Sequence, residues 1–192
     1  MSLGNLAFNL YQQRKYAEAA PLFREVVEAD REVHGDDHLA TQLAVGNLGL
    51  VLLEQGKLDE AEPLCVEAAA WFRAHPDVRP DLLVGYVGSL VELRRRQGRL
   101  AEAEQELGSL VADARAGLGP QHRTILIAEA IAARLKHAQP DGAAAGAAAL
   151  RAVVEKMGEF LGEEHPATLS CMGELGDWLQ EQGKLAEAEL LM

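Results

Sequence analysis

Leu58-Asp59-Glu60-Ala61-Glu62-Pro63-Leu64 is the second of four copies of one phrase. It follows Tyr16-Ala17-Glu18-Ala19-Ala20-Pro21-Leu22 and precedes Leu100-Ala101-Glu102-Ala103-Glu104 and Leu185-Ala186-Glu187-Ala188-Glu189. The central alanine recurs after 42 residues, after 42 more, and after a further 85, which is two periods plus one residue. A fixed period of this length is typical of stacked repeats. Such solenoids usually bind partners along an extended surface rather than catalyse.

Each period predicts two helices, most clearly in the second repeat. Helical spacing continues up to a break at Gln55-Gly56-Lys57, where Gly56 suits the positive φ that ends a helix. Because so short a break joins them, we expect antiparallel neighbours. Pro63 is expected in the first turn of the second helix, where a missing N–H costs little. The apolar stripes are Leu43, Leu48, Val51 and Leu52 in the first helix, and Leu58, Ala61, Leu64, Cys65 and Ala68 in the second.

The other repeats follow the same pattern. Breaks recur at Arg14-Lys15, Gln97-Gly98-Arg99 and Gln182-Gly183-Lys184. Small residues recur where paired helices are expected to touch, since a larger side chain would force them apart. These residues are Ala7, Gly49 and Gly176 on first helices, and Ala19, Ala61, Ala103 and Ala188 on second helices.

Three histidines mark the joints between repeats, in Gly35-Asp36-Asp37-His38, Gly119-Pro120-Gln121-His122 and the segment 161–168. Glycine suits the end of one helix and polar residues suit the start of the next. The histidines lie a repeat or more apart with no ligand at metal-binding spacing. We therefore expect capping or loop packing, and no metal.

The fourth repeat departs from the pattern. Its first helix is expected over 123–138, and Gln139-Pro140-Asp141-Gly142 replaces the usual turn and holds the one extra residue. The second helix is rich in alanine, so we expect it to bury less apolar area than its neighbours and to belong to the least stable pair. The Gly142-x-x-x-Gly146 spacing indicates two helices in close contact.

Composition restricts the class of protein. The 192 residues are 48% hydrophobic but only 5% aromatic, which favours closely packed helices. A net charge of −12 argues against nucleic acid and anionic membranes as partners, although acidity also serves solubility alone. Cys65 and Cys171 suit free core thiols in a reducing compartment, and no signal peptide is visible. We expect a cytoplasmic protein, and the Ala, Arg and Gly bias resembles bacterial sequences.

These motifs together resemble tetratricopeptide repeats of the kinesin light chain type. The resemblance is carried by the period, by Asn5-Leu6-Ala7 and Asn47-Leu48-Gly49, by Gln55-Gly56-Lys57, by the repeated phrase, and by Leu-Gly-Glu-Glu-His-Pro-Ala-Thr-Leu at 161–169. It covers essentially the whole chain and implies an all-α, right-handed superhelical solenoid of about four and a half repeats in one domain. The expected repeats are 1–36, 37–78, 79–119, 120–163 and an incomplete 164–192.

The resemblance implies that first helices line a concave groove for a peptide or partner protein. The groove positions it implies are Asn5, Phe8, Tyr11, Asn47, Leu50, Leu53, Glu54, Arg95 and Arg96, with Gln12, Leu43, Glu92, Asp177, Gln180 and Glu181. The family's clamp for a peptide carboxylate is missing, because only Asn47 fits, while Gly4, Phe8, Gly85 and Ser89 occupy its other places. A C-terminal carboxylate ligand is therefore not expected.

Two groups of groove residues have a second interpretation. Arg94-Arg95-Arg96 is suited to anchor an acidic ligand group, or to a solvated helix end, where the helix dipole favours cations. Phe8, Tyr11, Leu50 and Leu53 suit an apolar strip beside the arginines, or burial under a neighbouring helix.

The sequence favours a protein-interaction scaffold that binds a peptide or partner segment. The alternative is a sensory or regulatory repeat module of a larger signalling protein, of which this chain is a fragment, since the last copy of the phrase stops at Met192. Both terminal helices lack a polar capping helix, which predicts self-association through their apolar faces. An enzyme is not expected, because the sequence shows no catalytic set, no phosphate-binding loop and no cofactor motif.

Overall fold

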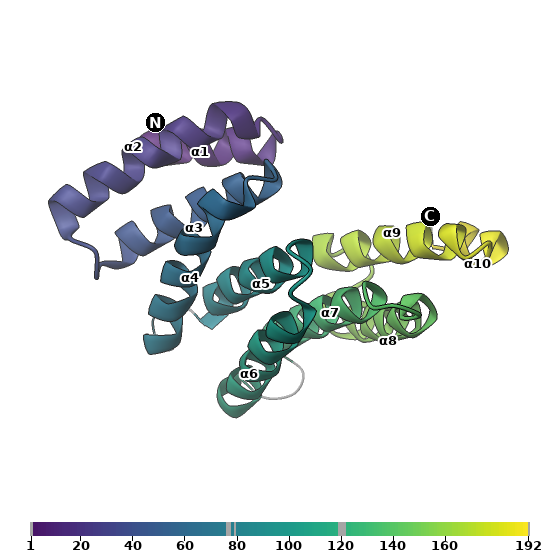
Figure 1. Ribbon diagram of the computed structural model, residues 1–192. Helices are drawn as coiled ribbons and strands as arrows, with labels where there is room; N and C mark the ends of the chain where they lie inside the picture. The colour runs from purple at the N-terminus through teal and green to yellow at the C-terminus, as the bar shows by residue number, and fades with distance from the viewer. Residues whose placement is uncertain (1, 76–77, 79, 119–121, 192) are drawn as a thin grey trace. The chain divides into compact units, whose positions relative to one another are not determined.

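The computed structural model describes residues 2–75, 78, 80–118 and 122–191, with residues 80, 81 and 113–118 described by their backbone alone. Ten α-helices occupy these residues, alternating as first and second helices of successive repeats (Figure 1). The prediction of an all-α repeat fold is therefore confirmed. The helices are α1 (Leu3–Gln12), α2 (Tyr16–His34), α3 (Leu39–Glu54), α4 (Leu58–Ala74), α5 (Pro80–Arg96), α6 (Leu100–Leu118), α7 (Arg123–His137), α8 (Ala143–Leu161), α9 (Pro166–Glu181) and α10 (Leu185–Glu189).

The chain divides into two compact units, Met1–Gln97 with α1 to α5 and Gly98–Met192 with α6 to α10. Within each unit every helix packs on the next in chain order. A second helix therefore covers both its own partner and the first helix of the following repeat, as α2 does with α1 and α3. No helix among the described residues is long and apolar enough to cross a membrane.

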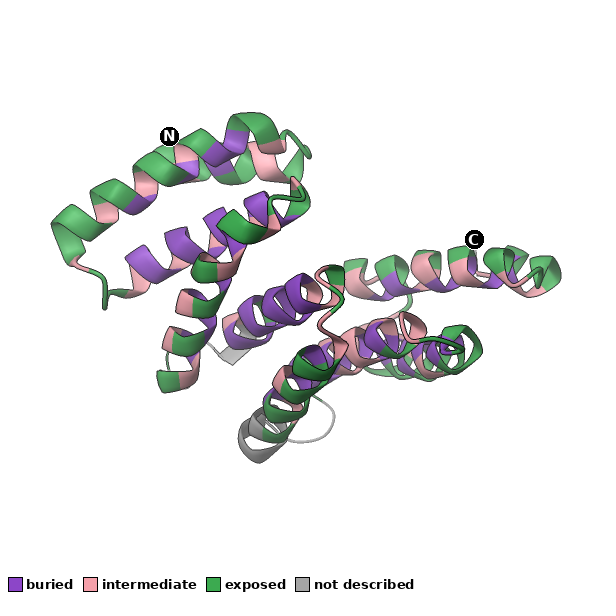
Figure 2. Ribbon diagram, in the orientation of Figure 1, coloured by how far each residue is buried: buried purple, intermediate pink, exposed green. Residues whose placement is uncertain are grey.

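Each unit has its own apolar core. In the first unit α3 is the most enclosed helix, with Val45, Val51 and Leu52 buried (Figure 2). In the second unit the core joins α7, α8 and α9. Helix α8, which was expected to bury less apolar area than its neighbours, has its large buried side chains from Leu150 onward. Its buried residues of this kind are Leu150, Val153, Val154 and Met157.

The turns inside the repeats share one geometry. Gly56 has φ of 73° and ends α3 as predicted, with its N–H donating to Leu53 and the Lys57 N–H donating to Leu52, both at 3.0 Å. Gly98 and Gly183 have φ of 76° and 75°, whereas Arg14 takes the same place in the first turn with φ of 59°. The turn after α7 spans residues 138–142 and holds the extra residue as expected.

The small residues lie at helix contacts, as predicted. Ala7, Ala19, Ala61 and Ala103 are fully buried. A Cβ on Gly49 would lie 3.0 Å from Cys65 Sγ, and the close approach predicted at Gly146 is tighter still. There a Cβ would lie 2.4 Å from His137 Cβ and 2.5 Å from His137 Cα.

The place predicted for Pro63 was wrong. Helix α4 already begins at Leu58, so Pro63 is its sixth residue and lies inside the helix, as Pro21 does in α2. Proline has no N–H to donate to the carbonyl four residues earlier. The helix therefore continues through this residue with one ladder hydrogen bond missing.

The joint histidines cap helices, as predicted. The Nδ1 atoms of His38, His122 and His165 accept from the backbone N–H two residues later, at 3.2, 3.3 and 3.1 Å. Gly35 and Gly162 end the preceding helices with φ of 84° and 97°. Gly119, Pro120 and Gln121 of the middle joint lie outside the described residues.

A glutamine links successive repeats in the turns that follow α3, α5, α7 and α9. Gln55 Nε2 donates to the carbonyl of Tyr16 at 2.6 Å, and Gln182 Nε2 donates to that of Ala143 at 3.1 Å. Gln97 and Gln139 donate instead to the side chains of Glu62 and Glu104. These bonds were not predicted from the sequence, although Gln55, Gln97 and Gln182 each directly precede the turn glycine, which was the available signal.

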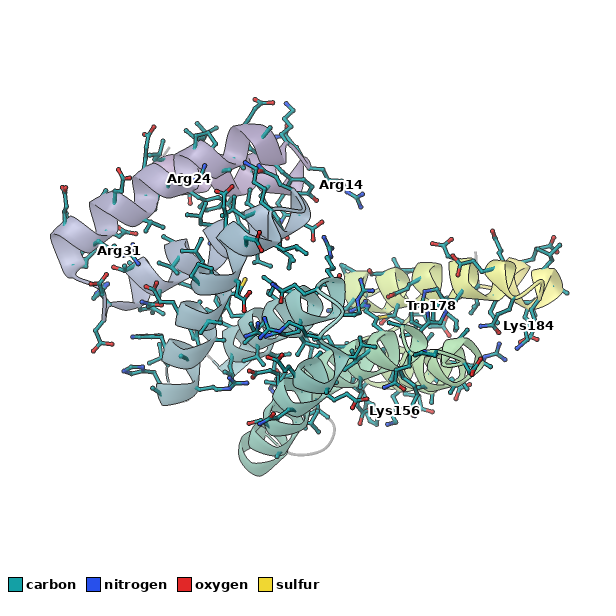
Figure 3. The ribbon with its side chains drawn as sticks, viewed as in Figure 1. Arg14, Arg24, Arg31, Lys156, Trp178 and Lys184 are labelled. Carbon is teal, nitrogen blue, oxygen red and sulfur yellow. The ribbon has the colours of Figure 1, made fainter. Side chains whose placement is uncertain are left out.

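Ion pairs between residues 36 positions apart in the sequence also join the second helices α2 and α4. Arg24 and Arg31 of α2, labelled in Figure 3, lie 2.7 and 2.9 Å from Glu60 and Glu67 of α4. These pairs are largely exposed, so each contributes little to stability.

Both cysteines are buried free thiols, as predicted. Burial, with a smaller contribution from Glu62, raises the pKa of Cys65 to about 11. Burial also raises the pKa of Cys171. Neither thiol ionises readily near neutral pH, which fits a packing role.

Candidate functional site

Four of the expected groove residues meet on one surface of the first unit. Phe8 and Tyr11, one turn apart on α1, line a shallow depression with Asn47 and Leu50, one turn apart on α3. Phe23 of α2 also lines this depression. We call Phe8, Tyr11, Asn47 and Leu50 the α1–α3 strip. Phe8 is 45% exposed and the other three are half-buried, so the strip is an accessible surface and not a sealed core.

Asn47 is the one polar group of the strip held by a defined partner. The Tyr86 hydroxyl lies 3.3 Å from Asn47 Oδ1, the nearer of its two acceptors, and 3.5 Å from the Leu43 carbonyl oxygen, and Tyr86 itself is only 5% exposed. Gly46 makes room for this tyrosine, since a Cβ there would lie 2.2 Å from Tyr86 Cε1. With Oδ1 so engaged, the amide NH₂ group of Asn47 is oriented as a donor.

Tyr11 connects the strip to a nearby negative charge. Its ring centroid lies 6.2 Å from that of Phe8 and 5.7 Å from that of Tyr16. Burial raises the pKa of the Tyr11 hydroxyl, and the charges of Glu54 and Tyr16 raise it further. The hydroxyl therefore stays a neutral donor. The negative charge of Glu54 is close enough to the strip to affect the ionisation of Tyr11.

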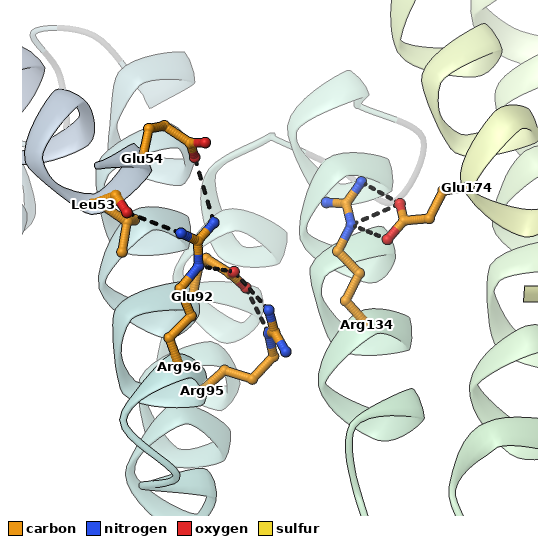
Figure 4. Close-up of polar contacts among 7 residues, drawn as sticks. All are labelled: Leu53, Glu54, Glu92, Arg95, Arg96, Arg134 and Glu174. Atoms are coloured by element: carbon orange, nitrogen blue, oxygen red, sulfur yellow. Dashed lines mark hydrogen bonds and ion pairs between the residues drawn. The ribbon is translucent and has the colours of Figure 1, made fainter. Parts of the chain in front are cut away.

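The last turn of α5 contains three arginines, which we call the arginine cluster: Arg94, Arg95 and Arg96. Figure 4 shows that Arg95 and Arg96 both reach Glu92 of the same helix. Arg95 donates through Nε and Nη2, both at 2.7 Å, and Arg96 donates through Nε at 2.6 Å. Arg96 Nη1 also donates to the Leu53 carbonyl at 2.9 Å, and its Nη2 lies 3.5 Å from Glu54 Oε1.

The cluster's charges are compensated inside the molecule. Arg94 is only 8% exposed and pairs with Glu62 of α4. Burial alone raises the pKa of Glu92, but the hydrogen bonds and charges of Arg95 and Arg96 outweigh burial and leave the pKa lowered. Three arginines thus meet three carboxylates, those of Glu54, Glu62 and Glu92. This arrangement fits a structural role at the helix end better than an open anchor for an acidic ligand.

The remaining expected residues divide between surface and core. Asn5 is exposed on α1, and its backbone N–H donates to Ser2 Oγ at 3.4 Å. Leu53 is only 2% exposed, so its side chain belongs to the core and is not available to a ligand. Of the four apolar candidates, burial was therefore the correct interpretation for Leu53 alone.

The expected groove residues of the second unit carry no comparable apolar strip. Asp177, Gln180 and Glu181 are exposed on the last turns of α9. Trp178 of the same turns stacks on His137, with ring centroids 3.8 Å apart. Arg134 of α7 pairs with Glu174 of α9, with Nη2 2.7 Å from Oε2 (Figure 4). Among the residues that the structure describes, no group of three or more His, Cys, Asp or Glu side chains could hold a metal ion.

Comparison with known families agrees with the helix pairs. Models of the tetratricopeptide repeat match residues 1–74 and again 168–192, together more than half of the chain. The chain belongs to the tetratricopeptide repeat family. No curated protein matches the tetratricopeptide repeat chain significantly.

Solved structures show the same fold. A putative kinesin light chain of Podospora anserina with nearly identical TPR-like repeats superimposes with a TM-score of 0.67 at 23% identity, covering 98% of this chain and 89% of that chain. A single-substitution variant of it gives 0.68 with the same identity and coverage. BtubC (BKLC) of P. vanneervenii gives 0.64 at 18% identity, covering 93% of this chain and 70% of that chain. At these identities the likeness concerns the fold of the repeats and not their partners.

Proposed function

We propose that this tetratricopeptide repeat chain is a protein-interaction scaffold that binds an extended peptide or partner segment along its first helices, in the groove that the family fold implies. The observation that carries the proposal is the α1–α3 strip, where two exposed or half-exposed aromatic rings, a leucine and an oriented amide share one surface. Apolar anchors with a few placed polar groups are how such surfaces recognise segments.

Each residue of the strip has a role that its position supports. Phe8 and Leu50 offer apolar surface to a large side chain of the segment, and Tyr11 adds an aromatic face with a neutral hydroxyl donor. The Asn47 amide NH₂ group is placed to donate to a backbone carbonyl of the segment. Covering an apolar side chain of this size is worth about 1.5–3 kcal/mol.

The test is a selection of peptides from a random twelve-residue display library on the whole chain. Binding of a selected, fluorescently labelled peptide is then measured by anisotropy. Phe8→Ala and Asn47→Ala should each weaken binding about tenfold, because each removes roughly 1–2 kcal/mol of contact. Phe160→Ala is the matched control, since Phe160 on α8 is 44% exposed but lies outside the strip. Equal affinity of all three variants and the parent chain would reject the strip as the binding surface.

A further inference from the structure

The strip lies on two helices that carry almost no charge. Helix α1 has no charged residue from Leu3 to Gln12, and α3 has a single one, Glu54, at its last position. Asn47, Leu50 and Glu54 follow one another at intervals of three and four residues, so they share one face of α3. Glu54 is therefore the single charge that these two helices themselves bring to the strip, and the arginine cluster adjoins it through Arg96.

The arginine cluster offers little to an acidic segment. Arg95 is held by two hydrogen bonds to Glu92, and Arg96 is engaged through all three of its guanidinium nitrogens. An acidic group that replaced Glu92 or Glu54 would leave that carboxylate without its arginine. Exchanging one carboxylate for another gains little, since the number of charge-assisted bonds stays the same.

Glu54 is the less compensated member of this network. Its carboxylate lies 3.5 Å from Arg96 Nη2, whereas Glu92 lies 2.6 Å from Arg96 Nε. The Glu54 side chain is 34% exposed. Its charge is also felt at the Tyr11 hydroxyl, where it raises the pKa. A cation beside the strip would therefore meet an accessible carboxylate at short range.

We infer that the α1–α3 strip selects segments with a large apolar residue next to a basic one, the basic side chain pairing with Glu54. The inference rests on the proposed function, since it specifies the segment that the same strip binds. It reverses the preference for acidic groups that the sequence of Arg94-Arg95-Arg96 suggested.

The experiment varies the charge of the peptide and the charge of residue 54, and measures the affinity of each combination. The peptides recovered from the display library are sequenced, and the best binder is remade with its basic residues changed to Ser or to Glu. Lys or Arg should be enriched beside an apolar residue, the Ser peptide should bind about threefold more weakly, and the Glu peptide about tenfold. Glu54→Gln should abolish the difference between the Lys and Ser peptides. Glu181→Gln, the same substitution at the last residue of α9, should keep it.

The outcomes separate the two proposals. Enrichment of acidic residues, or an unchanged Lys preference in Glu54→Gln, overturns the charge inference while the strip remains the binding surface. Failure to recover any peptide, or binding unaffected by Phe8→Ala, overturns the proposed function and this inference with it. Thermal unfolding of each variant shows whether it is folded. Glu54→Asp should retain the Lys preference, because it keeps the negative charge.

Discussion

Arg14 and Gly56 occupy the same position in two consecutive turns, 42 residues apart, and both have left-handed backbone, with φ of 59° and 73°. In both turns the following lysine N–H donates to the carbonyl five residues earlier. Glycine adopts this conformation without strain, whereas a residue with a side chain does so at a cost of about 1–2 kcal/mol. The exposed Arg14 side chain (Figure 3) therefore occupies a turn position better suited to glycine.

Replacing Arg14 with glycine should stabilise the first unit. We expect Arg14→Gly to raise the free energy of unfolding by about 0.5–1 kcal/mol in urea titrations, since relief of strain exceeds the added freedom of the unfolded chain. Gly56→Ala should lower it by about 1 kcal/mol. If Arg14→Gly were destabilising, the positive φ would not be a source of strain.

Gly146 marks the closest approach of α7 and α8. An added Cβ would lie 2.6 Å from the backbone nitrogen of His137, so the two helices would have to separate. We expect Gly146→Ala to lower the free energy of unfolding by about 1–3 kcal/mol. Gly158→Ala in the same helix is the control, because the nearest atom to its Cβ is 3.8 Å away and alanine favours helix. It should be neutral or stabilise by up to about 1 kcal/mol.

His165 tests whether the joint histidines are caps. Its Nδ1 accepts from the Ala167 N–H at the start of α9. His165→Ala should therefore lower the melting temperature through a loss of about 1 kcal/mol, and His165→Asn should recover most of it. Zinc added to the unsubstituted chain should leave the melting temperature unchanged. A zinc-dependent rise would instead support a metal role.

The α1 surface predicts association between copies of this chain. Leu3 and Leu6 are 37% and 42% exposed, whereas Val45 and Leu48, one period later on α3, are 0% and 5% exposed under the helices that pack there. We expect the apparent mass in sedimentation equilibrium to rise with concentration, and Leu6→Glu to reduce the rise. Val33→Glu on α2 is the control at an exposed valine. A constant monomer mass would contradict this prediction.

The repeating phrase was enough to predict the helix pairs, the turn glycines and the buried alanines, because each depends on contacts that recur in every repeat. It could not distinguish Tyr11 from Leu53, which are one period apart. Tyr11 remains half-buried, whereas Leu53 is covered and its carbonyl accepts from Arg96 of α5. Whether the side chain at this position is buried depends on how the neighbouring repeat packs against it. The sequence of one repeat carries no information on that packing.

The state of the arginine cluster could be predicted from the sequence only in part, for a similar reason. The carboxylates that compensate it, Glu54, Glu62 and Glu92, lie on three helices and are up to about forty residues from the arginines they meet. Helical spacing alone places Glu92 beside Arg95 and Arg96, whereas Glu54 and Glu62 meet the arginines only through the packing of α3 and α4 on α5. A run of three arginines therefore suggested an acidic ligand that the assembled charges do not favour.

The most direct test of the central claim is amide chemical-shift mapping of the ¹⁵N-labelled chain as the selected peptide is added. We expect perturbations concentrated at Phe8, Tyr11, Asn47, Leu50 and Glu54, with the second helices α2 and α4 little affected. Perturbations confined to second helices, or to the unit Gly98–Met192, would contradict it.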